Sequence, residues 1–294
     1  MMDQAERLRT IAKEQNPQPV NGARIITVTS GKGGVGKSNV AINLALQFRK
    51  IGKSVIILDA DFGLANIEVM FGVIPKYNLS DLIFKGKELK DIITAGPDNV
   101  GFISGGSGIA KMVNLNNDQI KSMVYKLNEL GKYADIIIVD TGAGISNSVL
   151  EFVSASPEVL LVTTEEPTSI TDSYALLKAL TMFPGYVKDE TKIRVIANKV
   201  SSIDAGKNLF DKLSAVVGKF LKIDLELVGI IPYDDNISKA VMKQKPISLS
   251  APDSTAAKSF EDIAKVLEEG TTAVFNDKVG IARFFARILF RRKK

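Results

Sequence analysis

The sequence contains no cysteine and no histidine. Without cysteine there are no disulfides, no thiolate ligands for zinc or an iron–sulfur cluster, and no cysteine nucleophile. Without histidine, a Ser-His-Asp triad and an imidazole-bound metal are excluded as well. Any catalysis therefore depends on carboxylates, lysine, arginine, hydroxyl groups, backbone amides or an oxygen-bound cation.

Long hydrophobic runs are also missing. No apolar stretch approaches the ~18 residues of a membrane span, and residues 1–4 do not begin a basic and then apolar signal sequence. The 294 residues are 45% hydrophobic and 24% charged, which is ordinary for a globular protein. We therefore expect a sizeable core and neither a membrane-spanning helix nor a signal peptide.

The positive charge is concentrated at one end of the chain. The formal net charge is +5, and residues 283–294 contain six basic side chains and no acidic one, which leaves about −1 for residues 1–282. The basic character therefore belongs to the tail. This distribution disfavours a nucleic-acid-binding function based on overall charge.

Uninterrupted apolar runs alternate with longer helical stretches. The runs that predict strands lie near 24–30, 55–59, 133–140, 159–163, 193–198 and 225–230. The stretches that predict helices lie near 39–48, 116–131, 167–182, 204–222 and 253–269. Strands without polar alternation are typical of a parallel sheet covered on both faces. The pattern predicts an α/β fold with an open, mostly parallel twisted sheet and helices on both faces.

A phosphate-binding loop follows the first predicted strand. It fits the pattern G-x-x-x-x-G-K-[ST] and consists of Gly31, Lys32, Gly33, Gly34, Val35, Gly36, Lys37 and Ser38. The loop amides and the helix N-terminus form an anion cradle, Lys37 adds a charge at the β- and γ-phosphates, and Ser38 offers a hard oxygen to Mg²⁺. A plain glycine turn is the weaker alternative.

Carboxylates follow two other predicted strands. Asp59 and Asp61 end one run, and Asp140 ends another. The carboxyl ends of parallel strands form the ligand-binding edge of an open α/β sheet. A carboxylate at a buried strand end is costly unless it is paired or near a metal. We therefore expect these groups to face the phosphate site.

The loop with its second lysine, Lys32, resembles the deviant Walker A motif of the MinD/ParA family of dimeric ATPases. The resemblance implies a P-loop NTPase fold over residues 22–270, bound ATP and Mg²⁺, and slow hydrolysis that depends on dimerisation. It implies three catalytic residues: Lys32, which reaches the partner's phosphates, Lys37, and Asp61, which orients the attacking water. It implies a metal site at Ser38, Asp59 and Asp140, and a nucleotide site that also takes in Asn39, Gly142, Asn198, Lys199, Pro232 and Asp234.

The proposed base-recognition residues are the weakest part of that set. Asn198 and Lys199 end one predicted strand, and Pro232 and Asp234 follow another. Such residues are also common in ordinary turns. The GTP-binding pattern N-K-x-D is incomplete because Ser201 replaces its aspartate, which favours ATP.

The N-terminal segment narrows the resemblance. Its matched positions, Asp3, Gln4, Ala5, Leu8 and Arg9, are similar to the DQAxxLR element of the FlhG branch (also called YlxH or FleN). The resemblance implies that residues 1–21 stimulate the flagellar GTPase FlhF, and that the protein regulates flagellar number and placement together with flagellar C-ring/switch proteins. A polar helix or tail without a partner is the alternative.

Residues 271–294 end in a basic amphipathic pattern. Ile281, Phe284, Phe285, Ile288 and Leu289 recur at helical spacing, with Arg283 and Arg287 on another face. Such a helix suits the interface of an anionic membrane, and an ordinary packing helix is the alternative. We expect its apolar stripe to pack on the protein in the monomer. We expect a cytoplasmic protein that sits peripherally on the inner face of the membrane in the ATP-bound state.

Two other functions share this core. One is a chromosome- or plasmid-partition ATPase of the ParA type that binds DNA, and the other is a division-site MinD. The nearly neutral residues 1–282 argue against DNA binding, and the N-terminal segment distinguishes the FlhG branch from MinD. A metal-cluster carrier on the same fold is excluded by the absence of cysteine.

Overall fold

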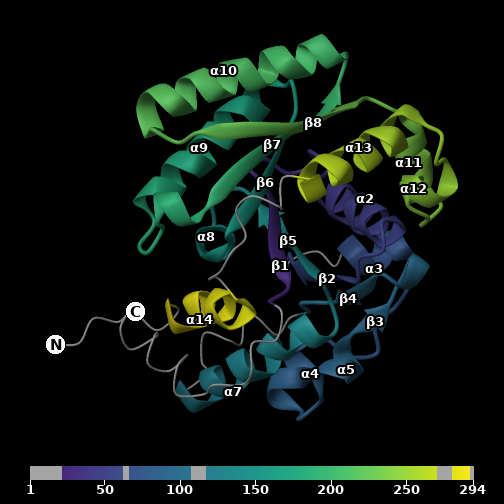
Figure 1. The fold of residues 1–294 in the computed structure, drawn as a ribbon, viewed down its shortest axis with the longest axis vertical. Coiled ribbons are helices and arrows are strands. Elements are labelled where there is room, and N and C mark those ends of the chain that lie inside the picture. The colour runs from purple at the N-terminus through teal and green to yellow at the C-terminus, as the bar shows by residue number, and fades with distance from the viewer. Residues whose placement is uncertain (1–21, 62–65, 107–116, 270–279, 292–294) are drawn as a thin grey trace.

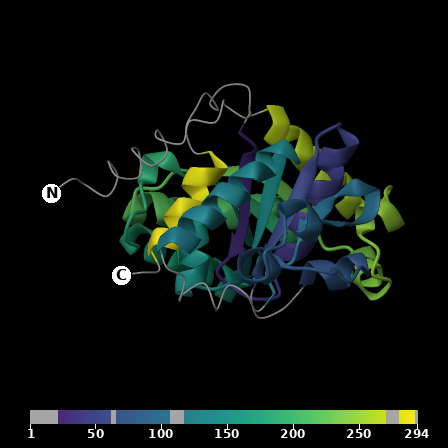
Figure 2. The ribbon, with the colours of Figure 1, turned by 90° about the horizontal axis from the view of Figure 1, so that it is seen from below.

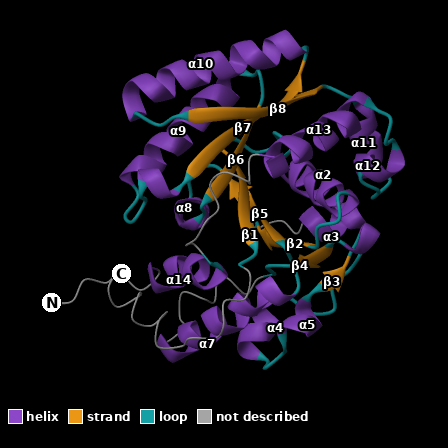
Figure 3. Cartoon of the chain, in the orientation of Figure 1, coloured by secondary structure: helices purple, strands orange, loops and turns teal. Residues whose placement is uncertain are grey.

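The computed structural model describes residues 22–61, 66–106, 117–269 and 280–291. The N-terminal positions Asp3, Gln4, Ala5, Leu8 and Arg9 lie outside these ranges. Figure 1 shows a central sheet with helices on both sides, and Figure 3 distinguishes the two kinds of element.

The described residues form one eight-stranded sheet in the order β3-β4-β2-β5-β1-β6-β7-β8. All neighbouring strands are parallel except β3 and β4, which pair antiparallel at one edge. The mostly parallel sheet expected from the sequence is thus confirmed. The strands are β1 Arg24–Ser30, β2 Val55–Ala60, β3 Thr94–Ala95, β4 Gly101–Ile103, β5 Ile136–Ala143, β6 Glu158–Thr163, β7 Lys192–Val200 and β8 Leu225–Pro232.

Helices of very different length connect and cover these strands. The described helices are α2 Lys37–Lys50, α3 Asn66–Phe71, α4 Leu79–Phe84, α5 Leu89–Ile92, α7 Asn117–Asn128, α8 Asn147–Ala155, α9 Pro167–Met182, α10 Ile203–Leu221, α11 Asp235–Met242, α12 Ile247–Ser250, α13 Thr255–Glu269 and α14 Ile281–Arg291. Three short 3₁₀ segments, η1 Pro97–Asn99, η2 Glu129–Lys132 and η3 Lys188–Glu190, complete the described elements.

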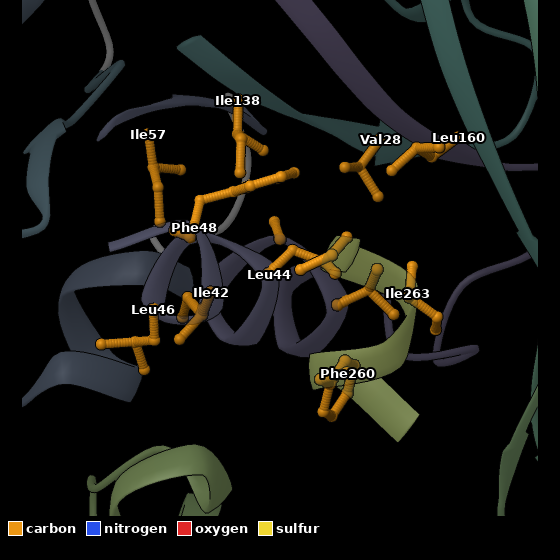
Figure 4. Close-up of a cluster of buried hydrophobic side chains, with 14 of the residues drawn as sticks. Val28, Ile42, Leu44, Leu46, Phe48, Ile57, Ile138, Leu160, Phe260 and Ile263 are labelled. Atoms are coloured by element: carbon orange, nitrogen blue, oxygen red, sulfur yellow. The ribbon is translucent and has the colours of Figure 1, made fainter. Parts of the chain in front are cut away.

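Successive strand residues point to opposite faces, so the continuous apolar runs feed two cores. On one face, the side chains of β1 and β5 join those of α2, α3 and α13. Figure 4 shows this cluster around α2, whose labelled members are Val28, Ile42, Leu44, Leu46, Phe48, Ile57, Ile138, Leu160, Phe260 and Ile263. On the other face, α4, α5, α7, α8 and α14 cover β1, β2 and β5, while α8, α9 and α10 cover β6 and β7.

The predicted strand at 133–140 was placed three residues too early. The chain at Tyr133 still belongs to the turn that follows η2, because the Tyr133 N–H donates to the carbonyl of Leu130. β5 then continues to Ala143, beyond the apolar run. Eight described elements were not predicted, and most of them are too short to show a periodic pattern: β3, β4, α3, α4, α5, α8, α11 and α12.

The C-terminal helix α14 packs into the core. The five residues of its apolar stripe are all buried, as we expected for the monomer. They join the cluster formed by β2, β5, α7 and α8, and Figure 2 shows α14 lying beside α7. Within the described residues, no helix is long and apolar enough to cross a membrane.

Candidate functional site

The phosphate loop connects β1 to α2, as the motif predicted. Gly34 has φ 78° and Gly36 has φ 100°, a left-handed conformation that a side chain rarely adopts. Gly36 directly precedes Lys37, the first residue of α2, so the free N–H groups of that helix begin at the loop. Such an arrangement is typical of an anion-binding site built from backbone amides.

Lys37 is buried at the start of α2. Burial lowers the pKa of its ammonium group, and the charges of Asp140 and Asp61 oppose that shift. The charges of two carboxylates expected at the phosphate site therefore act on this lysine. Lys37 lies in α2, Asp140 in β5 and Asp61 directly after β2, so the fold assembles them at one end of the sheet.

Asp59 and Asp140 lie opposite each other in the parallel pairing of β2 with β5. Burial raises the pKa of Asp140 to about 7, against the smaller effects of the nearby Ser38 hydroxyl and the Lys37 charge. Burial also raises the pKa of Asp59 to about 7, and the negative charge of Asp140 adds to this shift. Two acidic groups with raised pKa values indicate a site that favours a compensating cation.

The two carboxylates of the segment after β2 have different surroundings. Asp59 accepts hydrogen bonds from the backbone N–H groups of Asp61 (3.0 Å) and Ile67 (3.4 Å), so it fixes the turn that follows the strand. Asp61 is half-buried and accepts a hydrogen bond from the Asn66 side chain at 3.4 Å. A Cβ added at Gly142 would lie 3.6 Å from Oδ1 of Asp61, which places this carboxylate directly over the end of β5.

Lys32 forms contacts at the beginning of α9. Its ammonium nitrogen lies 2.5 Å from Oε2 of Glu166 and 2.9 Å from Oγ1 of Thr168. The Lys32 hydrogen bond, together with its charge, lowers the pKa of Glu166. No pattern in the sequence marks Glu166 or Thr168 as a partner of Lys32. Pro167 marks a helix start, but nothing in the sequence links that start to a lysine 134 positions earlier.

Asn198 and Lys199 lie against the phosphate loop. The Asn198 amide donates to the carbonyl of Val35 at 2.7 Å, and the Lys199 ammonium donates to the carbonyl of Gly34 at 2.8 Å. A Cβ on Gly36 would lie 2.5 Å from the same Asn198 amide nitrogen. The end of β7 therefore holds the phosphate loop through these two hydrogen bonds. A contact of Asn198 or Lys199 with a nucleotide base would be additional.

Pro232 and Asp234 follow the neighbouring strand. Pro232 is the last residue of β8. Asp234 accepts hydrogen bonds from the N–H groups of Asn236 (2.9 Å) and Ala256 (3.2 Å), so it caps α11 and ties it to the start of α13. The structure gives Asp234 a clear structural task, and its role in binding a base stays a prediction.

Comparison with known proteins decides the family. A model for ParA, described as a NUBPL iron-transfer P-loop NTPase, matches residues 21–268. The antiactivator FleN of Pseudomonas aeruginosa is 44% identical over 245 residues, which are 83% of this chain and 86% of that protein.

The chain belongs to the ParA/MinD family of P-loop ATPases.

Other members of the ParA/MinD family support this assignment. The flagellum site-determining protein YlxH of Helicobacter pylori is 32% identical over 98% of this chain and 99% of its own length. The MinD of Pyrococcus horikoshii, solved as a complex with Mg-ADP, has the same fold: the TM-score is 0.64 at 24% identity, over 85% of this chain and 98% of that one. The expected family, its FlhG branch and the fold are confirmed.

Membership in the ParA/MinD family makes this chain an ATP-hydrolysing enzyme. Lys32 and Lys37 belong to the phosphate loop, and the charges of Asp61 and Asp140 act on Lys37; that these four residues serve hydrolysis stays a prediction. The description of the family model also mentions iron transfer. This sequence contains no cysteine and so offers no thiolate ligand for iron.

Proposed function

We propose that this ParA/MinD-family ATPase is a nucleotide-controlled switch that regulates the number and placement of flagella. The observation that carries the proposal is its similarity to FleN and YlxH, of which YlxH is named as a flagellum site-determining protein. In this proposal ATP joins two copies of the chain, the dimer binds the inner face of the membrane, and hydrolysis releases it.

The nucleotide would be ATP with Mg²⁺. The structure offers two observations that fit. Both oxygens of Asp140, and Oδ1 of Asn198, are buried and accept no hydrogen bond of normal geometry from a described residue. Ser38 and Asp140 would hold the cation, with Asp59 supporting it through water, and Oδ1 of Asn198 is an acceptor of the kind that the adenine amino group satisfies.

The described residues contain no group of three or more acidic side chains able to hold a metal without further ligands. This agrees with a magnesium ion that arrives with the nucleotide, because Mg²⁺ is commonly bound by one or two protein oxygens together with phosphates. When bound, the cation would neutralise negative charge on the phosphates. Lys37 would add a second positive charge beside it, and the loop amides would orient the phosphate oxygens.

Dimerisation would give Lys32 its function. Its side chain is about one-third exposed and is paired with an exposed carboxylate, so it can exchange Glu166 for another anion at modest cost. We infer that in the dimer Lys32 turns to the phosphates of the partner. Hydrolysis then depends on pairing, since one chain alone does not supply both lysines to one nucleotide.

Membrane binding would use α14. Its apolar stripe and its basic residues are suited to the boundary between acyl chains and anionic headgroups. One such helix is a weak anchor, and a dimer that carries two gains avidity without a new contact. The N-terminal segment with Asp3, Gln4, Ala5, Leu8 and Arg9 would stimulate FlhF, and flagellar C-ring/switch proteins would be further partners.

Sizing by light scattering, with and without a non-hydrolysable ATP analogue and Mg²⁺, tests the proposal. We expect a dimer only with the analogue, no dimer for Lys37→Gln, and an ATP-stabilised dimer of Asp61→Ala that sediments with anionic liposomes. A monomeric Asp61→Ala protein in the presence of ATP and Mg²⁺ would refute the switch. Co-sedimentation with DNA instead of liposomes would support a partition function.

A further inference from the structure

The carboxylate of Glu190 contacts the basic side of α14. Nη2 of Arg283 lies 3.1 Å from both Oε1 and Oε2 of Glu190, and Nη2 of Arg287 contacts Oε2 of the same residue. Glu190 belongs to η3, the short turn between α9 and β7, and is far from the helix in sequence. Two arginines four positions apart therefore share one acidic partner on the core.

This ionic contact lies at the edge of a closely packed interface. The ring of Phe284 contacts those of Phe152 (centroids 6.1 Å apart) and Phe285 (5.1 Å). The space left beneath the helix is about 10 Å³, about the least that holds one water molecule, and its lining is apolar, so a water there would lack polar partners. In the first turn of the helix, the N–H of Ala282 donates to Oδ1 of Asn128 at 3.2 Å. The helix is thus held by an apolar stripe, one polar contact at its N-terminus and the Glu190 pair.

The two arginines differ in exposure. The side chain of Arg287 is only 10% exposed, whereas that of Arg283 is 41% exposed and that of Glu190 34%. Burial alone would raise the pKa of Glu190, but the hydrogen bond from Arg287 and the charges of Arg287 and Arg283 outweigh burial, so the pKa is lowered. Glu190 is therefore charged at neutral pH and neutralises a guanidinium that has little access to water.

We propose that Glu190 is an electrostatic latch that occupies Arg283 and Arg287 while α14 is docked, so that the core and anionic lipid headgroups compete for the same two arginines. The inference rests on the proposed membrane function and adds a residue that regulates it. A lipid phosphate and a carboxylate resemble each other for a guanidinium. Each is an anion with two oxygens that accept hydrogen bonds from paired N–H groups. The helix cannot satisfy both at once.

The latch sets the amount of anionic lipid needed to release the helix. While Glu190 is present, lipid has to replace a charge-assisted contact that is already made, and the net gain per arginine is small. When the carboxylate is removed, the nearly buried Arg287 loses the counter-charge that Glu190 supplies in the described part of the chain, which is a costly change. The docked helix is then destabilised, and anionic lipid no longer competes with this carboxylate for the two arginines.

The test uses the full chain, without nucleotide, and vesicles of phosphatidylcholine with increasing fractions of phosphatidylglycerol. We expect Glu190→Gln to bind anionic vesicles at least about tenfold more tightly than the unmodified protein, and to bind pure phosphatidylcholine no better. The matched control is Asp189→Asn, which removes the same charge from the neighbouring, exposed position of the same turn. The latch is refuted if the two variants bind equally.

A second readout needs no lipid. Hydrogen exchange of the backbone amides in residues 281–289 is expected to be faster in Glu190→Gln than in Asp189→Asn, while β1 and β5 stay protected in both. If no protein binds vesicles, even with an ATP analogue, the membrane function fails, and the exchange data still decide whether Glu190 holds the helix. If Glu190→Gln loses its fold, Glu190→Asp replaces it, because this variant keeps the charge on a shorter side chain. We expect exchange in residues 281–289 to be moderately faster in Glu190→Asp than in the unmodified protein. Equal exchange in these two proteins would refute the latch.

Discussion

The first glycine of the phosphate loop is expected to tolerate a methyl group poorly. A Cβ built on Gly31 lies 2.2 Å from the carbonyl carbon and oxygen of Asp172 and 2.5 Å from the nitrogen of Ser173. Ordinary contacts between carbon atoms are ~3.5–4.0 Å. The end of β1 and the first turns of α9 are therefore in backbone contact, and Gly31→Ala forces them apart by more than an ångström.

The cost of Gly31→Ala is expected at the upper end of the range for overpacking. Inserting a methyl group into a packed region costs about 1–3 kcal/mol when side chains can adjust. Here both partners are backbone, and Ser173 is buried and donates to the carbonyl of Ser169 at 2.8 Å, so little can yield. With roughly 2.1 cal/mol/K of unfolding entropy per residue, a loss of ~3 kcal/mol lowers Tm by roughly 5 °C in a chain of 294 residues.

Thermal unfolding without nucleotide measures this effect, and the same loop supplies the control. A Cβ on Gly33 would approach nothing closer than 4.0 Å, and Gly33 has no positive φ. We expect Gly33→Ala to keep Tm within about 1 °C of the unmodified protein. If Gly31→Ala unfolds at the same temperature as Gly33→Ala, the close packing of the loop on α9 is wrong.

Two further predictions concern charge. Burial raises the pKa of Asp140 to about 7, above its value of about 4 in an unfolded chain. The fold therefore favours the protonated carboxyl group, and the stability that this provides is complete at low pH and is lost as pH rises through about 7. Melting of the nucleotide-free protein should therefore occur at lower temperature at pH 8 than at pH 6, and Asp140→Asn should make that difference smaller; an unchanged pH profile in the variant would contradict this. Glu158 is fully buried and pairs with both Arg24 and Arg194, so Glu158→Gln should lower the free energy of unfolding in denaturant by about 3–5 kcal/mol. Glu226 also pairs with Arg194, but its side chain is 42% exposed. Glu226→Gln should therefore lower the free energy of unfolding by less than ~1 kcal/mol. Similar losses in the two variants would argue against the buried network.

The continuous apolar strands and the phosphate loop were readable because their signals are local. A buried parallel strand needs only a short apolar run, and the loop between Gly31 and Ser38 needs only eight adjacent residues between a strand and a helix. Asp59 and Asp140 could be placed because strand ends meet at the same edge of a parallel sheet.

Short elements were not predicted because they carry no local signal of this kind. β3 has two residues and β4 has three, so neither can display a period, and only the pairing with β2 makes them strands. α8 was missed although it has nine residues and a Ser146 cap. Its residues are mostly buried, so it lacks the polar face by which a surface helix is recognised.

The sequence by itself determined the class of sheet, the phosphate loop with its two lysines, and the amphipathic character of the last helix, because each depends on residues adjacent in the chain. Only the tertiary structure decided where those parts act: that Glu166 holds Lys32, that Asn198 and Lys199 clamp the loop, and that Glu190 faces the arginines of α14. These contacts join residues from 93 to 165 positions apart. No short-range pattern encodes them, since they arise only when the packing of both faces of the sheet fixes the distances between side chains.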